Sequence, residues 1–284
     1  MNTQKKFPKS FSCEFFPPKT EKGAENLRTT LSELATLNPA YFSVTFGAGG
    51  STQEGTFDTV KTIQEKGYAA APHLSCIGST QENIRTLLDS YIEIGVKRIV
   101  ALRGDMPSGM GNSTGEFRYA NELVEFIRNE TGDHFHIEVA AYPETHPQAS
   151  SAQADMNNFA RKVNAGANAA ITQYFYNADG YFRFVDDCEK LGIDIPIIPG
   201  IMPITNYSNL KRFSDMCGAE IPRWMAKRLD GFGDDKASIS AFGEAVVTEM
   251  CQKLLDSGAP GFHFYTMNQA GPTRTLWHNL GIDC

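Results

Sequence analysis

The chain has 284 residues, of which 41% are hydrophobic and 21% are charged. This is ordinary globular usage, which excludes a disordered chain and allows a sizeable buried core. A formal net charge of -7 disfavours nucleic acid and anionic membranes as partners, because a negative surface repels phosphate groups. The sequence contains no signal peptide and no apolar run of about eighteen residues, so we expect a cytoplasmic protein.

Short β-branched or apolar runs alternate along the chain with longer stretches of helical periodicity. This alternation predicts an α/β fold in which crossover helices join parallel strands. Eight such units predict one (β/α)8 barrel of the TIM type, and residues 1–284 are expected to form a single catalytic domain because no linker divides them. The predicted strands are Phe11–Phe16, Tyr41–Phe46, Ala69–Leu74, Arg98–Leu102, Ile137–Ala141, Ala169–Gln173, Ile195–Pro199 and Phe262–Thr266.

The helices are predicted from apolar spacing and from residues that start a helix. A leucine stripe at intervals of three and four residues predicts a helix over Glu25–Leu37. Ser79 and Glu82 have the spacing of a capping box that opens a helix over Thr80–Ile94. The connection between the seventh and eighth strands is the longest, and extra helices are predicted there at Ser208–Cys217, Ile221–Leu229 and Ala237–Leu255.

In barrels of this type the chemistry is built from the carboxyl ends of the strands and the loops that follow them. Seven of the eight predicted strands end in polar side chains, a pattern that is hard to attribute to chance. Taken singly, Thr45 and Gln173 could each make only a structural hydrogen bond at a strand end. Arg103 and Asp105 could form a local ion pair around a turn. The side chains expected at this rim are Glu14, Thr45, His73, Arg103, Asp105, Tyr142, Glu144, His146, Gln173, Tyr265 and Asn268.

Glu14 is the rim residue with the most specific environment, because it lies between Cys13 and Phe15 on an otherwise apolar strand. A carboxyl group in apolar surroundings is costly to ionise, so we expect the pKa of Glu14 to be raised. A raised pKa suits a general acid that works near neutral pH. A structural ion pair is the alternative for this residue.

Two glycine-rich segments resemble phosphate-binding loops but lack the full pattern. The segment 47–52 follows a strand but has Thr52 at the third glycine position of the dinucleotide fingerprint, and the segment 109–115 has the wrong spacing. A dinucleotide would therefore have to bind without these loops. Arg161 and Lys162, on the helix after the fifth strand, are basic residues that could meet a pyrophosphate.

Six motifs in fixed order carry a family resemblance that runs from about residue 11 to residue 282. They are Cys-Glu-Phe-Phe-Pro-Pro (13–18), Ser-Val-Thr-Phe-Gly-Ala (43–48), Ala-Leu-Arg-Gly-Asp (101–105), Ala-Ala-Tyr-Pro-Glu-Thr-His-Pro (140–147), Ile-Thr-Gln-Tyr-Phe (171–175) and His-Phe-Tyr-Thr-Met-Asn (263–268). Together they resemble the bacterial methylenetetrahydrofolate reductases.

The resemblance implies non-covalent FAD, NADH or NADPH as electron donor, and ping-pong reduction of 5,10-methylenetetrahydrofolate to 5-methyltetrahydrofolate, which supplies methyl groups for methionine synthesis. It implies Glu14 as the general acid that protonates N10 of the folate, with Asp105 close to the reacting rings. The FAD-binding residues that it implies are Thr45, Phe46, His73, Arg103, Gly104, Asp105, Tyr119, Ala120, Tyr142, His146, Ala149, Asp155, Asn158, Arg161 and Lys162. The substrate-binding residues that it implies are Glu14, Asp105, Gln173, Phe213, Tyr265 and Gln269.

One position departs from the resemblance, since Gln269 stands where many relatives have arginine. Glutamine can hydrogen-bond but cannot pair with an anion as a charge, and Arg274 is a candidate replacement. The alternatives are another flavin barrel, such as a proline-dehydrogenase-like oxidoreductase, and a folate- or flavin-binding barrel without turnover. A metal-dependent aldolase-type barrel is disfavoured by the lack of clustered ligands. The expected partners are small molecules and further copies of the chain.

Overall fold

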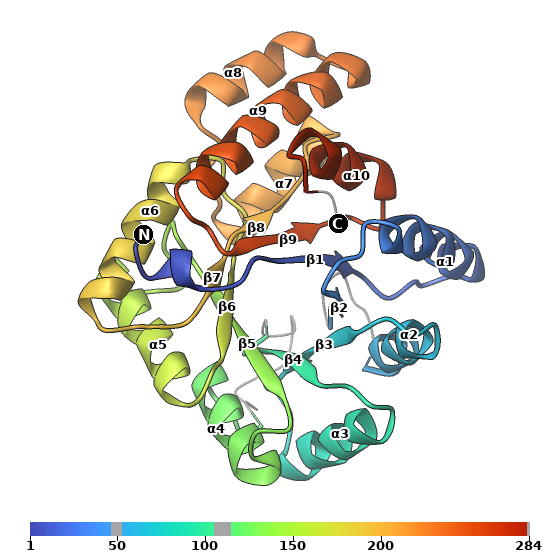
Figure 1. The fold of residues 1–284 in the computed structure, drawn as a ribbon, viewed down its shortest axis with the longest axis vertical. Helices are drawn as coiled ribbons and strands as arrows, with labels where there is room; N and C mark the ends of the chain where they lie inside the picture. The colour runs from blue at the N-terminus through green and yellow to red at the C-terminus, as the bar shows by residue number, and fades with distance from the viewer. Residues whose placement is uncertain (47–52, 105–114, 283–284) are drawn as a thin grey trace.

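A computed structural model describes residues 1–46, 53–104 and 115–282 of the chain. Within these residues a parallel sheet curls into a nearly closed barrel, and helices surround it (Figure 1). The strands are β1 (Ser10–Phe15), β2 (Tyr41–Val44), β3 (Ala70–Ser75), β4 (Arg98–Leu102), β5 (His136–Ala141), β6 (Ala169–Thr172), β7 (Ile197–Ile198), β8 (Gly200–Ile201) and β9 (Gly261–Tyr265).

A helix follows most strands and covers the outside of the sheet, as the predicted alternation requires (Figure 1). The first turn, η1 (Gln4–Lys6), is a short 3-10 helix. The α-helices are α1 (Glu21–Ala35), α2 (Gln53–Glu65), α3 (Gln81–Glu93), α4 (Ala120–Thr131), α5 (Ala152–Asn164), α6 (Ala178–Lys190), α7 (Tyr207–Cys217), α8 (Arg223–Phe232), α9 (Lys236–Asp256) and α10 (Ala270–Asn279).

The predicted seventh strand is confirmed in place but is broken at Pro199. On one side β7 pairs with β6, and on the other side β8 pairs with β9, so this segment joins the two edges of the sheet. Proline has no backbone N–H to donate to a ladder, while the carbonyl of Pro199 still accepts from the amide of His263 at 2.9 Å. The nine strands of the described residues therefore correspond to the eight predicted βα units.

Side-chain alternation along the strands separates two environments. Cys13 and Phe15 of β1 and Phe42 of β2 point outward into the large core between the sheet and the helices. The inward positions hold only a small apolar cluster, formed by Tyr41, Ala71, Val100 and Ile171. The other buried inward positions include polar side chains, so the barrel interior is a place where ionisable groups meet.

The extra helices predicted between the seventh and eighth strands are confirmed as α7, α8 and α9. Gly243 allows α9 to approach the chain after β8 closely, because a Cβ at this position would lie 2.4 Å from the carbonyl oxygen of Ile204. None of the helices in the described part of the chain combines the length and apolarity that crossing a bilayer requires.

Candidate active site

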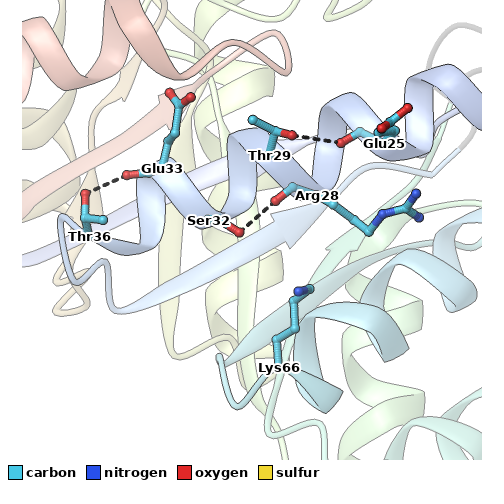
Figure 2. A pocket seen from close by; sticks show the side chains of 7 residues that line it. All are labelled: Glu25, Arg28, Thr29, Ser32, Glu33, Thr36 and Lys66. Atoms are coloured by element: carbon cyan, nitrogen blue, oxygen red, sulfur yellow. Dashed lines mark hydrogen bonds between the residues drawn. The ribbon is translucent and has the colours of Figure 1, made fainter.

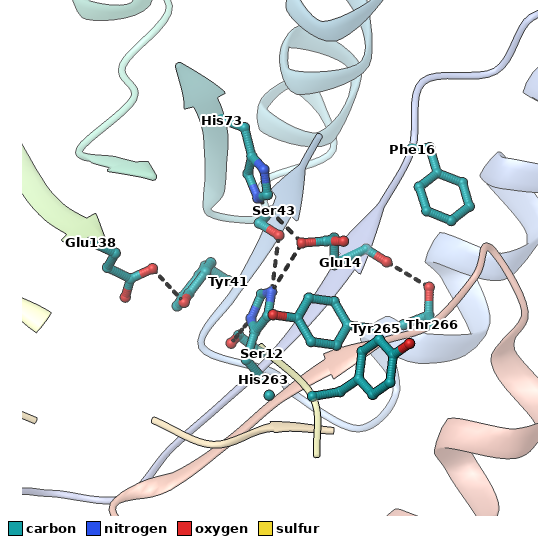
Figure 3. Close-up of polar contacts among 12 residues, drawn as sticks. Ser12, Glu14, Phe16, Tyr41, Ser43, His73, Glu138, His263, Tyr265 and Thr266 are labelled. Carbon is teal, nitrogen blue, oxygen red and sulfur yellow. Dashed lines mark hydrogen bonds and ion pairs between the residues drawn. The ribbon is translucent and has the colours of Figure 1, made fainter. Parts of the chain in front are cut away.

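Glu14 lies near the carboxyl end of β1 and points into the barrel (Figure 3). The register places it between Ser43 of β2 and Tyr265 of β9, which are also inward positions. Only 8% of the residue is exposed, and the Tyr265 hydroxyl beside it is engaged with the carbonyl oxygen of Thr172 at 2.8 Å. The predicted location of Glu14 at the rim is confirmed.

Two imidazoles approach the Glu14 carboxylate from neighbouring strands (Figure 3). Its Oε2 atom is 3.3 Å from His73 Nε2 and 3.5 Å from His263 Nε2. Burial raises the pKa of Glu14, but the two imidazoles outweigh that effect and lower it to about 2. The predicted rise in pKa is therefore wrong for this structure, because the sequence did not show that two histidines would face the carboxylate.

The backbone around Glu14 is held by the chain that follows β9. The Thr266 hydroxyl donates to the Glu14 carbonyl oxygen at 2.6 Å. The Asn268 side chain accepts from the amide of Phe16 at 2.9 Å and donates to its carbonyl at 3.0 Å. Met267 and Asn268 have positive φ values of 53° and 55°, a left-handed conformation that is strained for methionine and better tolerated by asparagine. The strain is offset by contacts that fix the exit of β1.

The rim after β2, β3 and β4 carries polar groups that point toward the barrel mouth. Thr45 Oγ1 and His73 Nε2 are buried atoms without a hydrogen bond among the described residues, although His73 Nε2 faces Glu14 at ion-pair distance. Arg103 donates to Gln148, and Phe46 is half-buried beside Thr45. Gly104 has a φ of 86°, and a Cβ there would lie 1.8 Å from Ser75 Oγ, so the turn after β4 requires glycine. Asp105 lies outside the described residues.

The loop after β5 is organised around His146. Its backbone amide donates to Asp155 on α5 at 2.8 Å, and its Nδ1 accepts from the amide of Gln148 at 3.0 Å. Its ring packs edge-on against Tyr142 with centroids 4.4 Å apart, and its carbonyl accepts from the amide of Ala149. Four of the predicted cofactor residues are thus brought together by this loop and the first turn of α5.

The predicted residues on α5 and at the start of α4 differ in how exposed they are. Lys162 places its ammonium against the carbonyl oxygen of Ala140, and burial lowers its pKa to about 8. Arg161 is exposed and donates to Asn158 at 3.0 Å. Tyr119 is 56% exposed at the first turn of α4, beside Ala120. The side chains of Arg161 and Tyr119 are therefore accessible, whereas the Lys162 ammonium is buried.

The predicted substrate residues other than Glu14 and Asp105 lie on the β6 to β9 side. Gln173 follows β6, and its side chain accepts from the amide of Tyr174; the two line a small cavity with Tyr142. The Tyr174 hydroxyl reaches Ser214 of α7 at 3.1 Å, which brings the helix of half-buried Phe213 to this side. Gln269 is exposed at the start of α10 and makes no capping bond with its side chain.

Arg274 does not replace the missing arginine in this structure. Its guanidinium lies 3.6 Å from Glu33 of α1. Glu33 lines a hollow on the outer face of α1, together with Arg28 and Lys66 (Figure 2). Because Arg274 is engaged on this outer face, the expectation that it stands in for an arginine at the site is not supported.

Sequence reasoning missed His263, which is fully buried on β9. The residue lies between Phe262 and Phe264, so from the sequence it is easily taken for a residue that only fills the core. The available signal was alternation, since a histidine two positions before Tyr265 must share its inward face. Groups of three or more histidine, cysteine or acidic residues that could hold a metal are absent from the described residues.

The sequence model of the family described as methylenetetrahydrofolate reductase matches residues 2–281. The chain belongs to the methylenetetrahydrofolate reductase family. It is 44% identical over 272 residues to 5,10-methylenetetrahydrofolate reductase of Escherichia coli (strain K12), which covers 95% of this chain and 90% of that protein. It is 38% identical to methylenetetrahydrofolate reductase (NADH) 1 of Arabidopsis thaliana, covering 96% of this chain and 48% of that one.

The fold is shared with a solved structure from Clostridium thermocellum at a TM-score of 0.69 and 15% identity, covering 99% of this chain and 95% of that chain. That protein is described as binding two copies of 5-methyl-5,6,7,8-tetrahydrofolic acid. The family match favours a folate reductase over the other flavin barrels and the passive binder that the sequence left open. It also confirms the resemblance that the six motifs carried.

Proposed function

We propose that this family member reduces 5,10-methylenetetrahydrofolate to 5-methyltetrahydrofolate with FAD as its hydride carrier and NADH as its electron donor. The described rim suits a flavin, because the buried Thr45 Oγ1 has no hydrogen bond among the described residues and a polar ring edge would supply one. Arg103, Arg161 and Lys162 provide cations for a pyrophosphate. When bound, FAD supplies the hydride chemistry that protein side chains lack.

The residues that would hold FAD come from four consecutive strand ends and the helices beside them. Thr45 and Phe46 follow β2, His73 lies on β3, and Arg103 and Gly104 follow β4. The remaining ones are Tyr119, Ala120, Tyr142, His146, Ala149, Asp155, Asn158, Arg161 and Lys162, with Asp105 outside the described residues. NADH is favoured as the donor by the name of the Arabidopsis relative, while NADPH is the alternative.

The folate would bind on the β6 to β9 side, next to Glu14. Gln173 offers an amide, Tyr265 a ring face, and Phe213 an aromatic surface for a flat heterocycle. Gln269 is positioned to hydrogen-bond but not to pair with the carboxylates of a folate tail as a charge. We therefore expect weaker tail binding than an arginine at this position would give.

The proton is the part of the reaction that this chain's own residues supply. The balanced reaction consumes methylenetetrahydrofolate, NADH and one H⁺, and yields methyltetrahydrofolate and NAD⁺. The bridging carbon cannot accept hydride until its bond to N10 opens, and a proton delivered to N10 makes that nitrogen a leaving group. Glu14 is the buried carboxyl group at the rim, and this observation carries the proposal.

The proposal is tested by following the colour of the purified protein without oxygen. Protein reconstituted with FAD should be yellow, should bleach when NADH is added, and should recover its colour when methylenetetrahydrofolate follows. A protein that binds no flavin contradicts the proposed cofactor. Bleaching without recovery contradicts the proposed folate reaction. Residues 1–284 are proposed to act as one catalytic domain in a cytoplasmic homo-oligomer, which light scattering would test.

A further inference from the structure

Glu14 is one end of a polar chain that crosses the barrel interior (Figure 3). His263 Nε2 lies 3.5 Å from Glu14 Oε2, and its Nδ1 lies 2.7 Å from Ser12 Oγ. Ser12 also hydrogen-bonds with the Tyr41 phenol, whose hydroxyl contacts Glu138 Oε2 at 2.6 Å. Apart from Glu14, each member of this chain is at most 1% exposed. We call the five residues Glu14, His263, Ser12, Tyr41 and Glu138 the core chain.

The far end of the core chain sets the direction of its hydrogen bonds. Glu138 is held by Arg98 at 2.7 Å, and the Arg98 guanidinium also lies over the Tyr41 ring at 4.5 Å. A carboxylate paired with arginine accepts, so the Tyr41 hydroxyl donates to it. The Tyr41 oxygen can then only accept from Ser12. With its hydrogen used, Ser12 Oγ must accept from His263 Nδ1.

We propose that His263 is a positioning residue that stores the proton delivered by Glu14, and that the core chain fixes which ring nitrogen stays protonated. With Nδ1–H donated to Ser12, the proton on Nε2 is the mobile one, and it faces Glu14 Oε2 at 3.5 Å and the Ser43 hydroxyl oxygen at 3.3 Å. The Nε2 proton first moves to the Glu14 carboxylate, and Glu14 then gives that same proton to N10, which leaves Glu14 as the anion and His263 neutral with Nδ1–H retained. One proton from solvent then restores the pair. This inference rests on the proposed folate reaction.

The arrangement explains how a carboxyl group with a lowered pKa can serve as an acid. The Glu14 and His263 pair holds one transferable proton, whichever of the two carries it. The role of the core chain is that of a group which orients a catalytic imidazole from behind. The other titratable groups that face the chain are His73, Tyr265, Arg98 and His136, and of these only Arg98 is a permanent cation.

The direct test is the protonation of His263 in the wild-type protein, read by ¹⁵N NMR of histidine-labelled samples. The His263 signal is assigned by its loss in His263→Gln. We expect a protonated Nδ1 across the neutral range, and a loss of that preference in Ser12→Ala. A neutral His263 that carries its hydrogen on Nε2 alone would overturn the proposal. This measurement needs no turnover, so it stands even if the proposed folate reaction fails.

The kinetic test compares the two half-reactions. His263→Gln should lower the rate of flavin re-oxidation by methylenetetrahydrofolate by about 10²-fold and change its pH profile, while NADH still bleaches the flavin at the wild-type rate. Ser12→Ala and Tyr41→Phe should lower the same rate by roughly tenfold. Thr273→Val is the control, because it removes a fully buried hydroxyl on α10, outside the barrel interior. Ser12→Ala with the pH profile of this control would overturn the proposal.

Discussion

Two carboxylates are buried inside the barrel, and their partners differ in kind. Glu138 contacts Arg98 and the Tyr41 hydroxyl at 2.7 and 2.6 Å, whereas Glu14 faces two imidazoles at 3.3 and 3.5 Å. Arginine keeps its charge at any accessible pH, but imidazole exchanges protons near neutrality. Glu138, at the end of the core chain away from the rim, is thus paired with a permanent cation. The carboxylate at the rim belongs to a group that can change its proton content.

The largest effect is expected when the acid at the rim, Glu14, is removed. In Glu14→Gln the amide keeps the shape but has no proton to donate to N10. We expect the rate of flavin re-oxidation by methylenetetrahydrofolate to fall by about 10²–10⁴-fold, with NADH reduction of the flavin retained. Stopped-flow absorbance of each half-reaction measures this. An equal loss in both half-reactions would show that Glu14 is structural.

Substitution of Glu138, at the other end of the core chain, should lower the free energy of unfolding instead. Glu138→Gln leaves the Arg98 guanidinium without its carboxylate, and breaking a buried pair on one side costs about 3–5 kcal/mol. Glu14→Gln should cost less, since its imidazole partners can become neutral. Urea unfolding of both variants measures the difference. The double variant Arg98→Met with Glu138→Gln should recover part of the lost stability. If Glu138→Gln is as stable as Glu14→Gln, the proposed difference between the two carboxylates is contradicted.

The two carboxylates also differ in how much of their pairing could be foreseen. The rim position of Glu14 follows from strand order, and the predicted bounds of β4 agree with the structure. The contact between Glu14 and His263 was harder to foresee, because alternation places both inside but they are 249 residues apart and meet only when the barrel closes. The pKa prediction failed for that reason. Alternation alone could have placed Glu138 and Tyr41 inside.

Local competition explains the smaller differences from the predicted elements. The capping box predicted for Ser79 and Glu82 is not formed, because Thr80 caps α3 by accepting from the amide of Asn83 at 3.2 Å. The amide of Ser79 is used by the Cys76 carbonyl at 3.1 Å. A sequence shows which residues are able to cap a helix, whereas the preceding turn decides which one does.

The stability of the wild type and of Glu14→Gln should differ in its dependence on acid pH. The pKa of Glu14 in the folded protein, about 2, lies below its ordinary value of 4.5. Its contribution to stability is therefore complete above about pH 4.5 and is lost as the pH falls toward 2. The free energy of unfolding, measured with denaturant, should fall more steeply between pH 6 and about pH 3 for the wild type than for Glu14→Gln. Parallel curves would mean that the imidazoles do not lower this pKa.

The smallest expected effect concerns the clamp that positions Glu14 from outside the barrel interior. Asn268 makes two hydrogen bonds with the backbone of Phe16 at a φ of 55°. Asn268→Gly loses the bonds but tolerates the left-handed backbone, whereas Asn268→Ala loses both advantages. We expect a loss of about 1–2 kcal/mol for glycine and roughly 1 kcal/mol more for alanine, measured by urea unfolding.

The same pair of variants separates positioning from strain. If the clamp orients Glu14, both variants should slow the folate half-reaction by similar factors, because both lose the contacts with Phe16. If strain alone matters, only Asn268→Ala should slow it, since glycine relieves the strained φ. A normal folate rate in both would show that Thr266, which holds the Glu14 carbonyl, is sufficient to fix the acid at the end of β1.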